Sequence, residues 1–287
     1  MLISPRYLLI AGCLVLMAQG CATQIARRSF NTSDGVALSL LEAGRQHSGS
    51  DKVKIALVTG WSMPASIWQN QLAELGRDYH ILAIDPRGQG ESTVPADGFT
   101  AERRARDLKE FLDPLKNILL IGWSLGAIES LQYVHMFGAE RLAGMVLVDS
   151  SVGEEPAPAP GGTFLQALRD DRDATLDGFV RAIFKSPRSD AEVAQWVAGA
   201  KRMSVEQSIA LLSYPFPRTH WKDIAHAFKP PLLYVVTPQF EEQAANLQKN
   251  RPGTEVEVFK DAGHTLFVDE PERFNDLIRK FANSLAR

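Results

Sequence analysis

The segment from Asn117 to Val134 constrains the fold of this chain more than any other stretch. It begins with the apolar run Ile118-Leu-Leu-Ile121, which predicts a buried strand, and it ends with apolar residues at helical spacing. Between the two stands the sequence Gly122-Trp-Ser-Leu-Gly126. The segment therefore predicts a strand, a tight turn and a helix.

A serine occupies the tip of this predicted turn. The glycines two residues before and two residues after Ser124 let the strand and the helix approach each other without a Cβ clash. The hydroxyl would then stand at the carboxyl edge of a sheet, where the free N–H groups of the new helix favour a developing negative charge. This arrangement is typical of a nucleophile elbow, so we expect Ser124 to be a nucleophile. The alternative is an ordinary strand–loop–helix junction.

The rest of the chain predicts a sheet of alternating strands and helices. The Asp34-Gly35 pair is a strong hairpin signal and joins two antiparallel edge strands. The hairpin strands are expected at residues 28–31 and 36–43. Apolar or β-branched runs predict further strands at residues 53–59, 79–84, 118–121, 145–148, 232–236 and 255–260. Helices are expected at residues 100–112, after Ser124, at 240–248 and from 272 onward.

The alternation stops after the sixth of these strands. Prolines and glycines from Pro156 to Gly162 mark a change of composition, and residues 163–228 predict several short helices rich in aromatic side chains. We expect these helices to form a cap over the sheet edge. The expected organisation is a signal peptide at 1–20, a core in two parts at 21–152 and 229–287, and a helical cap at 153–228.

Loops at the carboxyl ends of other strands carry further candidates. In Gly60-Trp61 the glycine lets the chain turn back, so that the N–H of Trp61 could face the serine as an oxyanion donor. The side chain of Trp61 could equally fill the core. In Gly263-His264 the histidine is placed to reach across the sheet edge. The loop Asp85–Ser92 contains Gly-x-Gly but lacks the helix start of a phosphate loop, so we interpret it as a rigid turn.

Four motifs together resemble those of the α/β-hydrolase superfamily in order and spacing: Gly60-Trp61, Asp85–Ser92, Gly122–Gly126 and Gly263-His264. The resemblance covers nearly the whole mature chain. The motifs are similar in particular to those of small capped esterases related to pimeloyl-carrier-protein methyl ester hydrolases, and to those of cofactor-free haloperoxidases and perhydrolases. The resemblance implies an α/β fold with a mostly parallel, eight-stranded, doubly wound sheet and a helical cap after the sixth strand.

The resemblance also implies roles for individual residues. Ser124 would be the nucleophile and His264 its base, because a serine hydroxyl needs a base to attack and the same imidazole can protonate the leaving alcohol. The N–H groups of Trp61 and Leu125 would form the oxyanion hole. One departure is Thr59, which stands where the family usually has a histidine. This change affects the support of the loop that contains Gly60 and Trp61, here called the oxyanion loop, more than it affects the N–H of Trp61.

The acid of the catalytic triad is the more serious departure. In most members it follows the strand that here ends at Val236, but this chain has Thr237–Phe240 and no carboxylate before Glu241 and Glu242. Certain haloalkane dehalogenases take the acid from the end of the preceding strand, where this chain has Asp149. A carboxylate fixes the tautomer of the imidazole. We therefore expect Asp149 to be the acid, with either glutamate, or no acid, as open alternatives.

The N-terminal stretch has the features of an export signal. Residues 1–6 carry one positive charge, and residues 7–18 are almost wholly apolar but too few to span a membrane. The sequence Ala-Gln-Gly-Cys at 18–21 resembles, with mismatches, the lipobox of bacterial lipoproteins. We expect lipid attachment at Cys21 and an exported, periplasmic, membrane-anchored protein, with plain secretion as the alternative. Cys13 and Cys21 are the only cysteines, so the mature domain would hold no disulfide.

Composition and chemistry together limit the function. With 45% hydrophobic and 23% charged residues and a net charge of -3, the chain has the composition of a globular enzyme, and no basic face for nucleic acid is implied. No cluster of His and Cys predicts a metal site, and no cofactor is implied. We expect a carboxylic ester hydrolase that acts on a small-molecule ester through an acyl-serine intermediate. The alternatives are perhydrolysis, in which peroxide replaces water, and a non-catalytic protein that binds a ligand in the capped cavity.

Overall fold

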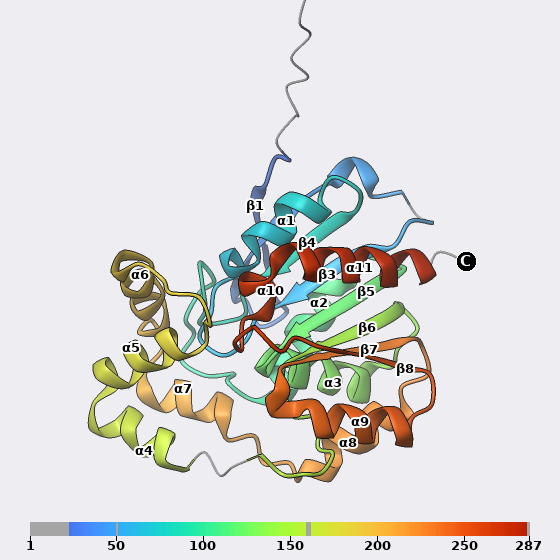
Figure 1. Cartoon of the computed structure of the whole chain (residues 1–287). Coiled ribbons are helices and arrows are strands. Elements are labelled where there is room, and N and C mark those ends of the chain that lie inside the picture. Colours follow the sequence, from blue (N-terminus) through green and yellow to red (C-terminus); the bar gives the residue numbers. More distant parts are fainter. Residues whose placement is uncertain (1–22, 50, 159–161, 286–287) are drawn as a thin grey trace, which may run out of the picture.

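An eight-stranded sheet runs through the middle of the molecule (Figure 1). The computed structural model describes residues 23–49, 51–158 and 162–285, so the expected signal peptide and Cys21 lie outside the described residues. The strands are β1 (Ala26–Asn31), β2 (Ala37–Ala43), β3 (Lys54–Val58), β4 (His80–Ile84), β5 (Ile118–Trp123), β6 (Leu142–Val148), β7 (Leu232–Val236) and β8 (Thr254–Val258).

The order of the strands across the sheet is β1-β2-β4-β3-β5-β6-β7-β8. β2 pairs antiparallel with β1 and with β4, and every pair from β4 to β8 is parallel. The expected eight-stranded, mostly parallel sheet is therefore confirmed. Of the two expected edge strands, only β1 lies at the edge, because β4 covers the other side of β2.

The central strands are hidden on both faces. β3, β5 and β7 are buried along their whole length. Parallel strands covered on both faces have near-continuous apolar sequences, which is why these strands are visible in the sequence. β8, at the far edge, is only partly buried.

Helices cover both faces of the sheet, as a doubly wound fold requires. The face toward the viewer in Figure 1 carries α1 (Gln69–Leu75), α10 (Leu266–Asp269) and α11 (Pro271–Leu285), whose apolar side chains share one core cluster. Short 3-10 turns precede several elements: η1 (Arg45–His47), η2 (Ala65–Trp68) and η3 (Pro238–Phe240). No helix among the described residues is long and apolar enough to cross a bilayer.

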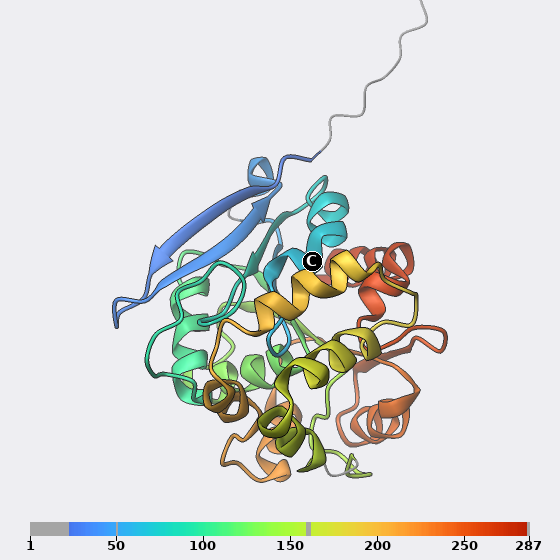
Figure 2. The same ribbon diagram turned by 90° about the vertical axis from the view of Figure 1, so that its left-hand side faces the viewer.

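Four helices lie beyond the carboxyl edge of the sheet and face the viewer in Figure 2. They are α4 (Gly162–Asp170), α5 (Arg172–Ala182), α6 (Asp190–Ala200) and α7 (Val205–Leu212), and they are inserted between β6 and β7. Their apolar residues, such as Leu176, Val180 and Val193, belong to the same buried cluster as Trp61 and Leu125. The four helices therefore pack onto the edge where the site candidates lie.

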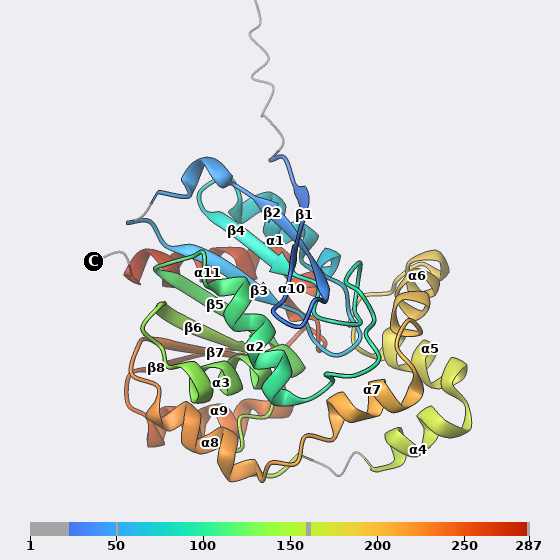
Figure 3. The ribbon, with the colours of Figure 1, turned by 180° about the vertical axis from the view of Figure 1, so that it is seen from behind.

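The opposite face of the sheet carries α2 (Ala101–Leu112), α3 (Leu125–Phe137), α8 (Arg218–Ala227) and α9 (Glu241–Asn250) (Figure 3). α2 and α3 lie side by side there, and α8 packs against α3. The last helix of the segment 153–228 thus lies on the face of the sheet, while α4 to α7 lie beyond its edge. The start of α2 is capped by Thr100, whose side chain accepts a hydrogen bond from the N–H of Arg103.

Candidate active site

The backbone at Ser124 has the geometry expected of an elbow. Ser124 lies between β5 and α3 with φ 55° and ψ -120°, a conformation that costs a residue with a side chain roughly 1–3 kcal/mol. A Cβ on Gly122 would lie 2.4 Å from the carbonyl oxygen of Gly126, and a Cβ on Gly126 would lie 2.6 Å from that of Thr59. Only glycine fits at these two positions, so the strand and the helix can meet at Ser124.

His264 and Asp149 come together at the same edge of the sheet. The Nδ1 of His264 lies 2.7 Å from Oδ2 of Asp149, which directly follows β6 and is fully buried. The other carboxylate oxygen accepts hydrogen bonds from the backbone N–H and the hydroxyl of Thr237, at 2.7 and 2.8 Å. An ionised carboxylate only accepts, so Nδ1 carries a proton and Nε2 is left free to take one.

The two glutamates considered as alternatives lie elsewhere. Glu241 and Glu242 form the first turn of α9, and both are exposed. Among the described residues, the carboxylate that contacts the His264 ring is Asp149. The structure thus brings Asp149 to the histidine and leaves both glutamates in solvent.

The loop that carries His264 lies against the end of β5, the strand that precedes Ser124. Trp123 directly precedes Ser124, and its indole N–H donates to the carbonyl oxygen of His264 at 2.8 Å. The rings of Trp123 and His264 are 5.3 Å apart between centroids. The side chain of His264 is 27% exposed, so the imidazole is accessible to a substrate although Asp149 holds its Nδ1.

The oxyanion loop also lies against the serine. A Cβ on Gly60 would come 3.1 Å from the Cβ of Ser124, so the chain passes Ser124 at van der Waals distance. The N–H groups of Trp61 and Leu125 donate to no acceptor among the described residues. Neither N–H group is therefore engaged by another acceptor, and both remain candidate oxyanion donors.

The side chain of Trp61 joins this loop to the inserted helices. It is buried, and its indole N–H donates to the carbonyl oxygen of Ser208 in α7 at 2.8 Å. Its ring packs edge-on against those of Phe164 and Phe179, at 5.6 and 5.2 Å between centroids. The side chain of Trp61 therefore fills the core where the inserted helices pack, while its backbone N–H is a separate question.

A small cavity opens beside Ser124. Its volume is about 270 Å³, and besides the serine it is lined by Leu125, Ile128, Ser150, Leu211, Leu212, Tyr214 and Trp221. Most of these side chains are apolar, and α3, the end of α7 and α8 all contribute to the lining. The cavity therefore suits a small apolar group next to the reacting atoms. Among the described residues there is no group of three His, Cys, Asp or Glu side chains that could hold a metal ion.

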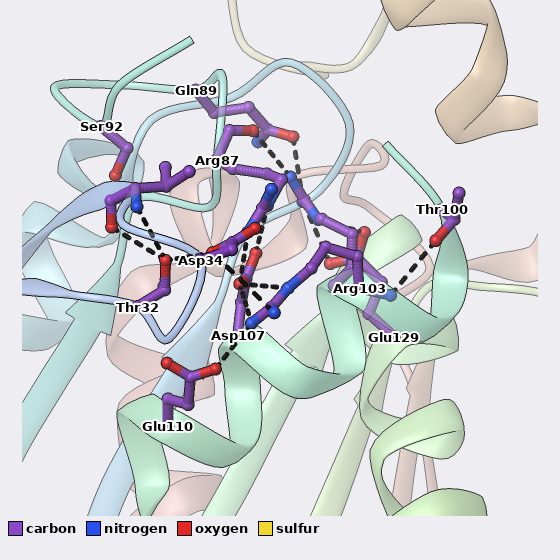
Figure 4. A network of polar contacts seen from close by, with 12 residues as sticks. Thr32, Asp34, Arg87, Gln89, Ser92, Thr100, Arg103, Asp107, Glu110 and Glu129 are labelled. Atoms are coloured by element: carbon purple, nitrogen blue, oxygen red, sulfur yellow. Dashed lines mark hydrogen bonds and ion pairs between the residues drawn. The ribbon is translucent and has the colours of Figure 1, made fainter. Parts of the chain in front are cut away.

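A buried polar network under the oxyanion loop was not anticipated from the sequence (Figure 4). Arg87 pairs with Asp107 through two hydrogen bonds of 2.6 and 2.8 Å. Arg104 pairs in the same way with Glu129 of α3, at 2.8 and 3.1 Å. Burial raises the pKa of Glu129, while Arg104 favours the ionised carboxylate. The sequence signal for this network is Glu129, an acidic residue within α3, which is otherwise largely apolar.

The fold and the site define the class of this protein. Residues 55–277 match the model of the alpha/beta hydrolase family, which is more than half of the chain, so the chain belongs to this family. The resemblance inferred from the four motifs is thereby confirmed.

Several known proteins are similar over most of their length. A pimeloyl-[acyl-carrier protein] methyl ester esterase from Vibrio parahaemolyticus is 22% identical over 258 residues, which is 79% of this chain and 93% of that protein. A bromoperoxidase structure from Bacillus anthracis matches with a TM-score of 0.78 at 20% identity, covering 90% of this chain and 100% of that one. An esterase structure from Rhodococcus sp. matches with a TM-score of 0.75 at 22% identity, covering 90% and 99%. The structural matches show the shared fold.

Proposed function

We propose that this protein hydrolyses carboxylic esters through an acyl intermediate on Ser124. The observation that carries the proposal is the His264–Asp149 pair, whose 2.7 Å contact occupies Nδ1 and leaves Nε2 as the proton acceptor. The loop of His264 is bonded to Trp123, the residue directly before Ser124. The methyl ester esterase from Vibrio parahaemolyticus and the esterase structure from Rhodococcus sp. support the same reaction class.

In the first half of the proposed reaction, His264 takes the proton of the Ser124 hydroxyl as its oxygen attacks the ester carbonyl carbon. The carbonyl oxygen becomes an oxyanion and accepts hydrogen bonds from the N–H groups of Trp61 and Leu125. Asp149 stays ionised and stabilises the imidazolium. The carbon–oxygen bond to the alcohol then breaks, and the alcohol leaves with the proton from His264.

In the second half, water replaces the alcohol. His264 takes a proton from the water as it attacks the acyl carbon, and the bond to the Ser124 oxygen breaks with return of the proton to the serine. The products are one carboxylic acid and one alcohol for each ester. The 270 Å³ cavity suits esters with a small or medium apolar acyl group.

Labelling with a fluorophosphonate probe tests the nucleophile. The folded wild-type protein should be labelled and should hydrolyse p-nitrophenyl acetate, whereas Ser124→Ala should do neither. A folded wild-type protein that stays unlabelled and inactive would favour a non-catalytic, ligand-binding protein instead.

Perhydrolysis is the second candidate, favoured by the bromoperoxidase among the structural matches. In that reaction hydrogen peroxide replaces water on the same acyl-enzyme and releases a peracid. Parallel assays of peracid formation and p-nitrophenyl acetate hydrolysis by one preparation separate the two. Peracid formation that exceeds hydrolysis at millimolar peroxide would favour the second candidate.

We also propose that the protein is exported and anchored by a lipid on Cys21. The apolar stretch at 7–18 and the sequence that ends at Cys21 support this. Cys21→Ser should release the protein from the membrane fraction, and unchanged fractionation would count against the anchor.

A further inference from the structure

Gln89 lies against the loop that carries Trp61. It is buried, and its Nε2 donates hydrogen bonds of 2.9 Å to the carbonyl oxygens of both Gly60 and Met63. Because carbonyl oxygens only accept, the end of the amide that faces them must be the NH₂ group. A longer contact of 3.3 Å reaches the hydroxyl of Thr59, the residue that stands in place of the family's usual histidine. Gln89 thus holds the oxyanion loop on both sides of Trp61.

The carbonyl of Gly60 and the N–H of Trp61 belong to one peptide unit. In a trans peptide these groups lie in one plane and point to opposite sides of the chain. A hydrogen bond from Gln89 to the carbonyl therefore also sets the direction of the N–H, on the side away from Gln89. The same bond polarises the peptide and makes the N–H a stronger donor.

Gln89 is in turn held by Arg104 of α2, which pairs with a residue of α3. Its Oε1 accepts from the guanidinium of Arg104 at 3.2 Å, and Arg104 forms the two-bond ion pair with Glu129 of α3. Gln89, Arg104 and Glu129 are each 1% exposed. Figure 4 shows Gln89 and Glu129 within one polar network beside α2 and α3. Leu125 is the first residue of α3 and Glu129 lies one turn later, so the network connects the oxyanion loop to the helix that begins with the second predicted donor.

The network also reaches the wall of the cavity. The hydroxyl of Tyr214 donates to Glu129 at 3.0 Å, and the Tyr214 side chain lines the cavity beside Ser124. Glu129 therefore accepts from two different side chains, and no polar side-chain atom of Gln89, Arg104 or Glu129 is left unpaired. Satisfied buried groups of this kind are held rigidly, because any displacement leaves a polar group unpaired in the interior.

We propose that Gln89 is a positioning residue that holds the two donors of the oxyanion hole at a fixed separation. The contacts run from Gly60 through Gln89 and Arg104 to Glu129, and they tie the loop amide to the elbow helix. The proposal rests on the proposed ester hydrolysis, because the separation of the donors matters only where an oxyanion forms. An oxyanion exists in the transition state and not in the bound ester, so the effect should fall on kcat rather than on KM.

Two substitutions of Gln89 test this role. Gln89→Met keeps the length of the side chain and removes its hydrogen bonds, whereas Gln89→Glu keeps the contact to Arg104 and loses the donor to Gly60. Both should lower kcat for p-nitrophenyl acetate roughly 10- to 100-fold with little change in KM. The affinity for a boronic acid that forms a tetrahedral adduct on the serine should fall by a similar factor. Affinity for the acetate product should not change.

A matched control lies in the same network. Asp34 pairs with Arg87 at 3.0 Å and contacts neither Gln89 nor the oxyanion loop. Asp34→Asn should lower thermal stability and leave kcat unchanged. If the wild type is active and both folded Gln89 variants keep its kcat, the positioning role is overturned. An equal loss of kcat in Asp34→Asn would overturn it as well. Failure of the wild type to react with fluorophosphonate would refute the proposed hydrolysis itself.

Discussion

Asp149 shows how much a single residue depends on its surroundings. It has φ 42°, an unfavourable value for a residue with a side chain, and its N–H donates to the carbonyl oxygen of Val235 in the neighbouring strand at 2.8 Å. The strained turn directs the carboxylate to Thr237 on one side and to His264 on the other. Backbone strain of this kind persists only where several contacts hold it, and it is common at functional sites.

Replacing Asp149 by Asn should lower kcat for ester hydrolysis by about 10⁴-fold. The amide is close in shape, but its NH₂ group facing Nδ1 would favour the wrong tautomer of His264, and no negative charge would stabilise the imidazolium. Steady-state kinetics and circular dichroism measure activity and fold together. Full activity in a folded Asp149→Asn protein would return the role of the acid to Glu241 or Glu242.

At the scale of elements, the short helix α10 holds the loop of the histidine in place. Asp269 ends this helix and accepts hydrogen bonds from the N–H groups of Gly263 and Lys185, both at 2.9 Å, and from Ser186. Lys185 and Ser186 lie between α5 and α6. Burial alone would raise the pKa of Asp269, but these hydrogen bonds hold it below its ordinary value. One carboxylate thus joins the histidine loop to the inserted helices.

Asp269→Asn should destabilise the protein by about 1–3 kcal/mol at neutral pH, because the amide keeps one acceptor and turns a donor toward N–H groups. The folded pKa is lowered, so this contribution is present above the unfolded pKa of about 3.9 and is lost as the pH falls through the folded value. Thermal unfolding measured between pH 7 and pH 3 should show the two proteins converging in acid.

The control for this prediction is Asp276→Asn in α11, whose exposed carboxylate pairs, within the part of the chain that the structure describes, only with Arg279. Its effect on unfolding should be small at every pH. A difference between wild type and Asp269→Asn that grows in acid would contradict the account of Asp269.

At the scale of the whole molecule, the cavity exists only because two distant parts of the chain meet. Ile128 belongs to the elbow helix α3, whereas Leu211 and Leu212 end α7, more than eighty residues later in the sequence. The indole of Trp61 fixes the same helix to the oxyanion loop through Ser208. The inserted helices therefore set the volume next to Ser124.

Substitutions of Leu212 should change the preferred acyl length. Leu212 lines the cavity yet is 38% exposed, so its replacement should cost little stability. Leu212→Ala should raise, and Leu212→Phe should lower, the ratio of kcat/KM for p-nitrophenyl butyrate to that for the acetate, each by about 10-fold. Unchanged ratios in both variants would place the acyl group outside this cavity.

The sheet and the elbow could both be predicted from the sequence, because both leave local signals. Buried parallel strands appear as apolar runs, and the turn at Ser124 requires glycine at Gly122 and Gly126, where any Cβ would strike the backbone. His264 was likewise visible from its place in a glycine-containing loop after a strand. The four-residue helix α10 left no signal, since it is too short for a helical period.

Which groups share the site depends on how distant segments of the chain pack together. Asp149, Glu241 and Glu242 were all possible acids in the sequence, and the distance to the imidazole depends on how β6, β7 and the histidine loop pack together. The network through Gln89, Arg104 and Glu129 could not be predicted for the same reason, although Glu129 stands out in a largely apolar helix. Its partners lie on three separate segments, and each hydrogen bond forms only after burial has brought those segments together.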